Sequence, residues 1–270
     1  MKYTRYASLF LMIILCTVLT ACENTSTTGA TSSTALTLKV FAASSLLESF
    51  GTLAQRYHKI HPLVTITYNF AGSQVLEQQL ASGASADIFA SADNANMQKA
   101  SAAGLVEPAH IFAKNKLVVI VSRHSSTHIT SLKDLTRNGV KIDIEAASVP
   151  AGQYTLQVLD KMSYSPEYGP TYKAAVLGHV VSQEDNVKAV VQKVQLGEAD
   201  AGFVYQTDVT ASVSSQVDTI PIPDTLNVIA QYPIAALKQS SHPTEAQTFV
   251  QYVLSPDGQA ILAQYHFLGV

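Results

Sequence analysis

The sequence predicts an α/β protein built from two lobes. Short apolar strands alternate with amphipathic helical segments from about residue 36 onward, and the alternation restarts near residue 117. Strands that alternate with helices predict a parallel sheet covered on both faces. For a chain of 270 residues, two α/β units of about 100 residues with a cleft between them is the simplest architecture.

The first round of alternation supplies three strands and two helices. The helix that follows the first strand is marked by apolar residues at helical spacing, Leu46, Leu47, Phe50, Leu53 and Tyr57. We expect strands at 36–41, 64–70 and 86–90, and helices at 45–58 and 74–82.

The second round begins with an unbroken apolar run at 117–121, LVVIV, of the kind that is buried in a parallel sheet. The remaining elements follow from the same periodicities. We expect further strands at 140–144, at 201–205 and within 228–237, and helices at 151–162, 186–196, 243–254 and 257–265.

The N-terminal segment indicates export. Lys2 and Arg5 precede an apolar run at 9–15, and the segment ends in Leu-Thr-Ala-Cys at 19–22. This is the pattern of a secretory signal, and the run is shorter than the roughly 20 residues of a membrane-spanning helix. The ending resembles a bacterial lipobox, which implies that Cys22 is acylated and becomes the new N-terminus. The alternative is an ordinary signal peptide with an incidental cysteine.

We therefore expect residues 1–21 to be a lipoprotein signal peptide. The Ser/Thr-rich stretch 22–36 would then be a flexible tether between lipid and fold. The mature protein would be anchored by lipid to the cell membrane, on its extracytoplasmic face.

Composition narrows the classes of partner. The formal net charge is −3, and removing residues 1–21 makes it −5. No cluster of basic residues occurs, so we expect no nucleic-acid partner. A net negative protein that binds an anion must do so with local dipoles. The cysteines, Cys16 and Cys22, both lie in the N-terminal segment, so we expect neither a disulfide nor a thiolate metal site in the fold.

Small or hydroxyl residues recur where an expected strand gives way to a helix. The first turn of a helix leaves backbone N–H groups unpaired and carries the positive end of the helix dipole. Several such turns converging on one cleft could hold an anion without Lys or Arg. The four positions are 42–45 (AASS), 71–73 (AGS), 149–152 (VPAG) and 184–187 (EDNV).

The serines of these turns also have a purely structural interpretation as helix caps. Ser45 stands three residues before Glu48, which is the spacing of a capping box.

Six short motifs follow one another along the chain: VFAASSL at 40–46, FAGS at 70–73, ADIFASAD at 86–93, VPAGQY at 149–154, EDNV at 184–187 and GFVYQTD at 202–208. In this order they resemble the molybdate-binding component of bacterial molybdate ABC transporters. A C-terminal segment, LSPDGQAILAQYHF at 254–267, is similar to the closing helix of that family, and the resemblance spans about 37–267.

The resemblance implies a periplasmic-binding-protein-like fold, two α/β lobes with a hinge and an interlobe ligand cleft. The first lobe would comprise 37–116 with 228–270, and the second 117–227. The protein would be a monomeric binding protein, not an enzyme and without a cofactor. It would capture molybdate, and also tungstate, and deliver the oxyanion to an ABC permease.

The resemblance also implies the ligand contacts. Ser45 and Ser73 would contribute hydroxyl groups from the first lobe. The second lobe would contribute the backbone N–H groups of Ala151 and Val187 and the hydroxyl group of Tyr205.

The sequence departs from the family pattern at three places. Glu145 is followed by Ala-Ala-Ser in place of a proline, and His266 replaces a glycine. Asn186 directly precedes Val187 and could change how the turn presents its N–H.

Other kinds of site are weaker interpretations. Asp87 and Asp93 could form an acid–base pair, but no nucleophile accompanies them, and Asp93 is better placed as a helix cap. The histidine pairs at 58–61 and 124–128 have metal-ligand spacing without a third ligand nearby. Two alternatives for the function stay open: a binding protein for another oxyanion such as sulfate or phosphate, and a sensor lipoprotein of the same fold.

Overall fold

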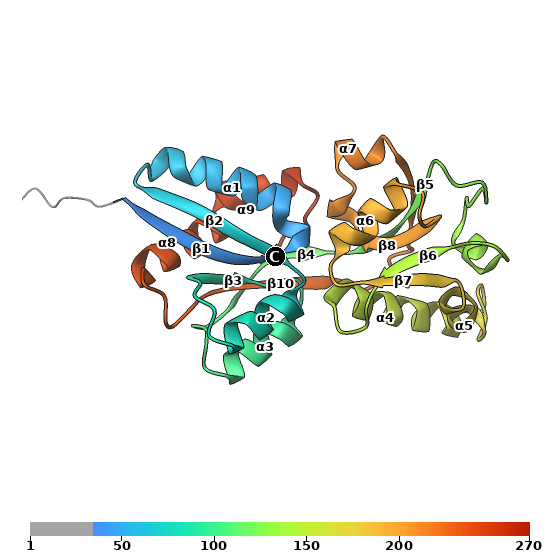
Figure 1. The fold of residues 1–270 in the computed structure, drawn as a ribbon, viewed down its shortest axis with the longest axis horizontal. Coiled ribbons are helices and arrows are strands. Elements are labelled where there is room, and N and C mark those ends of the chain that lie inside the picture. The colour runs from blue at the N-terminus through green and yellow to red at the C-terminus, as the bar shows by residue number, and fades with distance from the viewer. Residues whose placement is uncertain (1–34) are drawn as a thin grey trace, which may run out of the picture. The chain divides into compact units, whose positions relative to one another are not determined.

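Two five-stranded sheets organise the protein, and the computed structural model describes residues 35–270 (Figure 1). The first sheet has the order β2-β1-β3-β10-β4 and contains β1 (Leu36–Ala43), β2 (Val64–Ala71), β3 (Ile88–Ala90), β4 (His110–Asn115) and β10 (Ala230–Ala236). The second has the order β7-β6-β8-β5-β9 and contains β5 (Leu117–Ser122), β6 (Ile142–Glu145), β7 (Val180–Glu184), β8 (Ala201–Tyr205) and β9 (Val217–Pro221).

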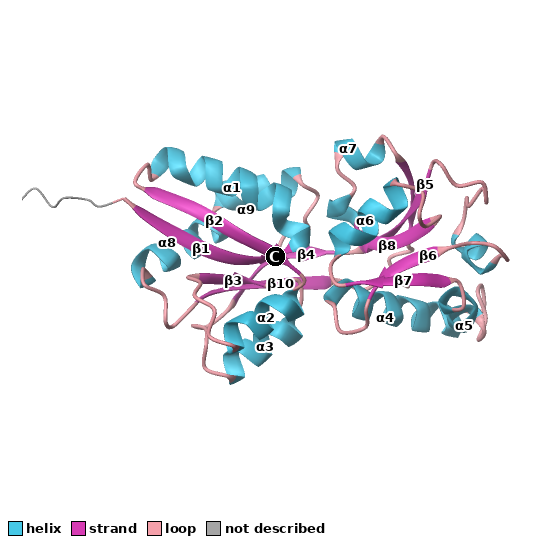
Figure 2. Cartoon of the chain, viewed as in Figure 1, coloured by secondary structure: helices cyan, strands magenta, loops and turns pink. Residues whose placement is uncertain are grey.

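Helices cover both sheets, and each sheet with its helices forms one lobe (Figure 2). The first lobe contains α1 (Leu47–Ile60), α2 (Ser73–Ala81), α3 (Asn94–Ala102), α8 (Pro243–Leu254) and α9 (Pro256–Gln264). The second lobe contains α4 (Pro150–Tyr164), α5 (Tyr172–Leu177), α6 (Val187–Gln195) and α7 (Ala211–Ser214), and short 3-10 turns are η1 (Ser44–Leu46), η2 (Leu132–Thr136) and η3 (Gln206–Asp208). The predicted α/β class with two lobes is confirmed.

The sheets are mixed, so the prediction of parallel sheets was wrong in part. Strand β10 runs antiparallel to β3 and β4, and β5 runs antiparallel to β8 and β9. The apolar run 117–121 is buried as expected, but both of its neighbours are antiparallel. A strand that is covered on both faces becomes apolar whatever its direction, so its sequence does not reveal that direction.

Local periodicity located most of the other elements. The strand β8 and the helix α8 have the predicted bounds, and other predicted helices differ by a few residues at their ends. Strands β4, β7 and β9 were not predicted. Each is short and carries polar or charged residues among its apolar ones, which weakens the pattern.

The chain passes between the two sheets twice. Lys116 alone separates β4 from β5, and residues 222–229 separate β9 from β10. The buried Asn227 ties these crossings together: its Oδ1 accepts the N–H of Leu117 at 3.1 Å, and its Nδ2 donates to the carbonyl of Leu117 at 2.8 Å. The expected lobe boundaries, 37–116 with 228–270 and 117–227, stay a prediction.

The expected signal peptide, the tether and Cys22 lie outside the described residues, apart from the last residues of the tether. Among the helices of residues 35–270, none has the length and apolar character needed to cross a membrane.

One buried carboxyl group in the second lobe has no hydrogen-bond partner among the described residues. Asp143 on β6 is fully buried, and neither carboxyl oxygen has a hydrogen-bond partner among the described residues. Burial, followed by the nearby charge of Glu184, raises the pKa of Asp143 to about 7, although Lys193 opposes the shift. The folded protein therefore holds this proton more tightly than the unfolded chain does.

We predict that Asp143→Asn removes a pH-dependent loss of stability. Because the folded pKa lies above the ordinary value of 3.8, the free energy of unfolding should fall as pH rises from about 4 through 7. At pH 8 the free energy of unfolding of the variant should exceed that of the wild type by up to about 4 kcal/mol, and at pH 4 the two should differ little. Urea denaturation at both pH values measures this. The exposed Asp160 provides the control Asp160→Asn, and an equal response of both variants to pH would contradict the prediction.

Candidate functional site

A small cavity lies where the two lobes meet. It is lined from the first lobe by the ends of β1 and β2 and the starts of the helices that follow them. The second lobe contributes the starts of α4 and α6 and the end of β8. The lining residues are Ala43, Ser44, Ser45, Ala71, Gly72, Ser73, Ala92, Glu145, Val149, Pro150, Val187 and Tyr205.

Four of the five predicted contact residues line this cavity: Ser45, Ser73, Val187 and Tyr205. The fifth, Ala151, follows the lining residue Pro150 and is fully buried in the first turn of α4. The structure therefore brings the predicted residues of both lobes to one place.

Ser45 belongs to the turn η1 that joins β1 to α1, and its Oγ lies 3.0 Å from the hydroxyl of Tyr232. The Nδ2 of Asn115 donates to that tyrosine hydroxyl at 3.4 Å. The hydroxyl of Tyr232 can donate to Ser45 while it accepts from Asn115. In that arrangement the hydroxyl proton of Ser45 is available to a ligand. Sequence reasoning did not identify Tyr232, which lies 187 residues away in the chain.

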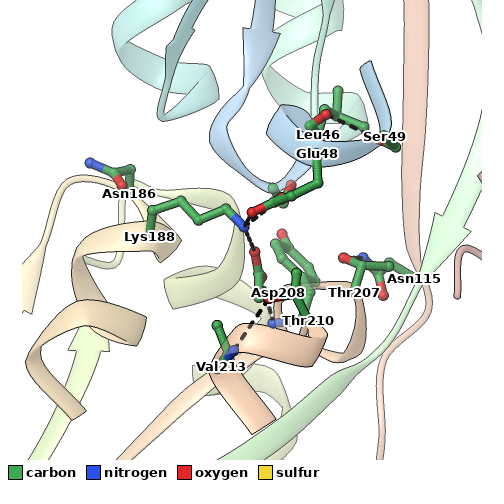
Figure 3. Close-up of polar contacts among 12 residues, drawn as sticks. Leu46, Glu48, Ser49, Asn115, Asn186, Lys188, Thr207, Asp208, Thr210 and Val213 are labelled. Atoms are coloured by element: carbon green, nitrogen blue, oxygen red, sulfur yellow. Dashed lines mark hydrogen bonds and ion pairs between the residues drawn. The ribbon is translucent and has the colours of Figure 1, made fainter. Parts of the chain in front are cut away.

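The capping box predicted for Ser45 and Glu48 is wrong. Helix α1 has Leu46 as its N-cap, with no side-chain hydrogen bond to the cap. The carboxylate of Glu48 instead contacts Lys188 of the second lobe (Figure 3). The spacing fits a cap, but η1 inserts a tighter turn before the α-helix and moves the cap position past Ser45.

Ser73 is the first residue of α2, and its Oγ accepts the N–H of Ala92 at 2.9 Å. The hydroxyl proton is left to donate elsewhere. The preceding Gly72 lies against the other lobe: a Cβ on it would stand 2.2 Å from the carbonyl oxygen of Asp185. Gln74 also reaches this carbonyl, donating through Nε2 at 3.0 Å.

Helix α6 begins at the cavity, as expected if the first turns of helices bind an anion there. Asn186 is its N-cap, and the Oδ1 of Asn186 accepts the N–H of Ala189 at 3.2 Å. Val187 is the first helical residue and is buried at the cavity. Asn186 therefore acts as an ordinary N-cap and leaves the N–H of Val187 without a capping bond from its own side chain.

Tyr205 closes the second-lobe side of the cavity. It is the last residue of β8, its side chain is buried, and its hydroxyl has no hydrogen-bond partner among residues 35–270. Burial, with smaller effects from nearby groups such as Tyr232, raises the pKa of the Tyr205 hydroxyl well above its ordinary value. The hydroxyl thus stays a neutral donor. A buried donor without a partner is costly, so the site is built for a group that accepts hydrogen bonds.

Glu145 is a cavity residue whose role sequence reasoning missed. Its carboxyl is buried, and Oε2 accepts the N–H of Gly152 at 3.1 Å. Burial raises the pKa of Glu145 to about 8, despite the N–H groups of Gly152 and Ala151, while Asp208 and Asp93 add to the rise. The group is therefore protonated at neutral pH and adds no full negative charge to the cavity.

The described part of the chain offers neither a cluster of metal ligands nor a basic side chain in the lining of the cavity. No three His, Cys, Asp or Glu side chains of residues 35–270 gather as they would around a metal ion. Asp93 caps α3, accepting the N–H of Asn96 at 2.9 Å, as predicted. None of the cavity-lining residues is Lys or Arg.

The sequence matches the family model for bacterial extracellular solute-binding proteins over residues 38–268. The molybdate-binding protein ModA of Mycobacterium tuberculosis (strain ATCC 25618 / H37Rv) is 36% identical over 235 residues, which is 86% of this chain and 85% of that protein. YvgL of Bacillus subtilis (strain 168), named as a substrate-binding lipoprotein of an ABC transporter, is 28% identical over 96% of this chain and 97% of its own length.

A solved structure extends the comparison to three dimensions. The substrate-binding domain assigned to a molybdenum ABC transporter from Clostridium difficile superimposes with a TM-score of 0.64. It is 30% identical in sequence, and the match covers 87% of this chain and 99% of that domain.

We predict that Gly72→Ala disturbs the contact between the lobes and leaves each lobe intact. The new Cβ would overlap the carbonyl oxygen of Asp185, and overpacking of this kind costs about 1–3 kcal/mol. Small-angle scattering should show a larger radius of gyration for the variant than for the wild type. Gly51→Ala on α1 is the matched control, because a Cβ there has no neighbour within 4 Å. An unchanged radius in Gly72→Ala would contradict the prediction.

Proposed function

The chain belongs to the family of bacterial extracellular solute-binding proteins, and on this premise we propose that it captures molybdate for an ABC importer. The observation that carries the proposal is the cavity between the lobes, where serine and tyrosine hydroxyls and the starts of helices meet without a cation. A tetrahedral dianion offers only acceptors, and these groups offer donors. The names of the similar proteins from Mycobacterium tuberculosis and Clostridium difficile support molybdate as the ligand.

We assign the ligand contacts to the predicted five residues. Ser45 and Ser73 donate their hydroxyl protons from the first lobe, and Tyr205 donates from the second. The backbone N–H groups of Ala151 and Val187 complete the set, aided by the helix dipoles of α4 and α6. Because the protein as a whole is negatively charged, its overall field does not attract an anion. The anion must therefore be held by local donors such as these.

Capture proceeds by closure of the lobes. Donors of both lobes are needed to satisfy one anion, so the closed form binds it better than an open form, and binding shifts the population toward closure. The crossings at Lys116 and 222–229 serve as the hinge. The closed form then docks on a membrane permease and releases the anion into it.

Selection against sulfate follows from size. Molybdate has the same charge and shape but longer bonds to oxygen, so donors spaced for molybdate leave sulfate short of hydrogen bonds. Each unmade bond to a buried polar group costs about 1–3 kcal/mol. Tungstate is nearly the same size as molybdate, and we propose that the site binds both.

Anchoring completes the proposed function. The Leu-Thr-Ala-Cys ending at 19–22 supports removal of residues 1–21 and attachment of lipid at Cys22. The similar protein of Bacillus subtilis is named as a lipoprotein, which supports the same arrangement. The protein would then work as a monomer on the outer face of the cell membrane, beside its permease.

Two alternatives differ in measurable ways. A binding protein for sulfate or phosphate would keep the fold and change the ligand. A sensor lipoprotein of this fold would show no closure driven by an oxyanion. Enzymatic activity has no support in the site, because the hydrogen bonds of Ser45 and Ser73 go to Tyr232 and Ala92 and not to the carboxyl of Glu145.

Calorimetric titration with molybdate, tungstate, sulfate and phosphate tests the proposal. We expect one-to-one binding of the first two and little response to the others. Ser45→Ala and Ser73→Ala should each weaken binding about tenfold or more, because each removes a hydrogen bond to a charged group. Tight binding of sulfate or phosphate would overturn the ligand, and unchanged affinity in both variants would overturn the assigned pocket.

Glu145 makes binding depend on pH. Its pKa in the folded protein is about 8, above the ordinary 4.5, so it loses its proton as pH rises through 8. The resulting negative charge repels the anion, and molybdate affinity should then fall by up to about tenfold per pH unit above 8. Glu145→Gln keeps a neutral group that can still accept the N–H of Gly152.

We therefore expect calorimetry of the Glu145→Gln variant to give nearly the same affinity at pH 7 and pH 9. The wild type, measured in the same buffers, should bind more weakly at pH 9. A variant that loses affinity as steeply as the wild type would show that the pH dependence arises elsewhere.

A further inference from the structure

Lys188 on α6 joins the two lobes through an ion pair beside the cavity (Figure 3). Its Nζ lies 2.9 Å from Oε1 and 2.8 Å from Oε2 of Glu48, which belongs to α1 of the first lobe. The same Nζ lies 3.0 Å from Oδ1 of Asp208, which belongs to η3 of its own lobe. One ammonium group therefore stands between a carboxylate of each lobe.

The two carboxylates differ in burial. The side chain of Asp208 is 0% exposed, whereas those of Glu48 and Lys188 are 32% and 23% exposed. Burial alone would lower the pKa of Lys188, but Asp208 and Glu48 together hold it above its ordinary value, so the lysine keeps its charge. Burial raises the pKa of Asp208, and Lys188 opposes that rise. The pair of Lys188 with Asp208 is thus a fixed part of the second lobe, and Glu48 is the partner that comes from the other lobe.

Each of these three residues is close to an assigned ligand contact, either in the sequence or through a hydrogen bond. Glu48 follows Ser45 by three residues, and Lys188 directly follows Val187. Asp208 accepts the N–H of Tyr205 through Oδ2 at 3.2 Å. Forming the ion pair between Glu48 and Lys188 therefore brings the donors of the first lobe toward those of the second.

A second ion pair, between Lys116 and Asp224 at 2.9 Å, lies within the two crossings of the chain and so at the hinge. The polar contacts between the lobes nearer the cavity involve neutral groups. Gln74 donates to the carbonyl of Asp185 at 3.0 Å, and the hydroxyl of Tyr154 lies 3.5 Å from the carbonyl of Ala92. Within residues 35–270, the contact of Lys188 with Glu48 is the ion pair that joins a helix of the first lobe to a helix of the second. It acts over a longer range than a neutral hydrogen bond as the lobes approach.

We propose that Lys188 is a positioning residue that holds the lobes closed by pairing with Glu48, and that this pair sets the affinity and residence time of the anion. The ion pair itself stands on the geometry of the lobes, whereas its effect on a ligand rests on the proposed function. A binding protein whose ligand fits only the closed form loses affinity in proportion to the fraction of molecules that are open. The pair raises the closed fraction without touching the anion.

Glu48→Gln is the informative variant, because it removes the contact between lobes and leaves Lys188 paired with the buried Asp208. Spin labels on cysteines introduced at Gln78 of α2 and Gln157 of α4, both exposed, report the separation of the lobes. Cys16 and Cys22 are replaced by serine in all proteins compared, so that the labels attach only at the chosen positions.

We expect the distance distribution of Glu48→Gln to contain less of the closed form than the wild type, with and without molybdate. The dissociation constant for molybdate should rise about threefold to tenfold, mainly through faster release. Raising the salt concentration should open the wild type more than the variant, since salt screens a partly exposed pair.

The control is Asp160→Asn, which breaks the 2.8 Å ion pair between Asp160 and Lys173 inside the second lobe. It should leave both the distance distribution and the dissociation constant unchanged. Identical distributions for Glu48→Gln and the wild type at every ligand concentration would overturn the proposal. If no oxyanion binds the wild type, the proposed function fails, and the ligand-free distributions still decide whether the ion pair closes the lobes.

Discussion

The arrangement depends on one constraint: a doubly charged anion must be held in a buried place by groups that carry no full charge. Such an ion loses its hydration on entering the protein, and only a complete set of oriented donors can replace that hydration. The cavity offers the starts of helices and four side-chain hydroxyl groups, three of them assigned to the ligand, and none of its described lining residues is Lys or Arg. Because these donors come from two lobes, they can be complete only when the lobes meet.

Charged groups near the cavity are kept from competing with the ligand. Glu145 would repel an anion if ionised, but burial raises its pKa to about 8 and keeps it protonated at neutral pH. Lys188 could attract an anion, but Glu48 and Asp208 already contact its ammonium group. The hydroxyl of Tyr232 forms a 3.0 Å hydrogen bond with Oγ of Ser45. In the proposed function the anion therefore meets a neutral, donating surface, while the ion pair holds the lobes together at the edge of the cavity.

Much of the fold around the cavity could be predicted from the sequence, because short-range patterns determine where each strand and helix begins and ends. The end of β8 at Tyr205 and the start of α6 at Val187 are local features, and each lies within one residue of where the sequence indicates. The direction of β5 was predicted wrongly, since an apolar strand looks the same whichever way its neighbours run. Long-range partners were missed because local patterns carry no information about distant residues. Nothing near Glu48 in the sequence indicates Lys188, which is 140 residues away.

A crystal structure of the protein grown with tungstate, measured for anomalous scattering at the tungsten absorption edge, tests the central claim most directly. The account predicts one strong tungsten peak in the cavity between the lobes. The anion's oxygens should lie within hydrogen-bond distance of the hydroxyls of Ser45, Ser73 and Tyr205 and of the N–H groups of Ala151 and Val187. A peak elsewhere in a closed molecule, or a tungstate held by lysine or arginine side chains, would contradict it.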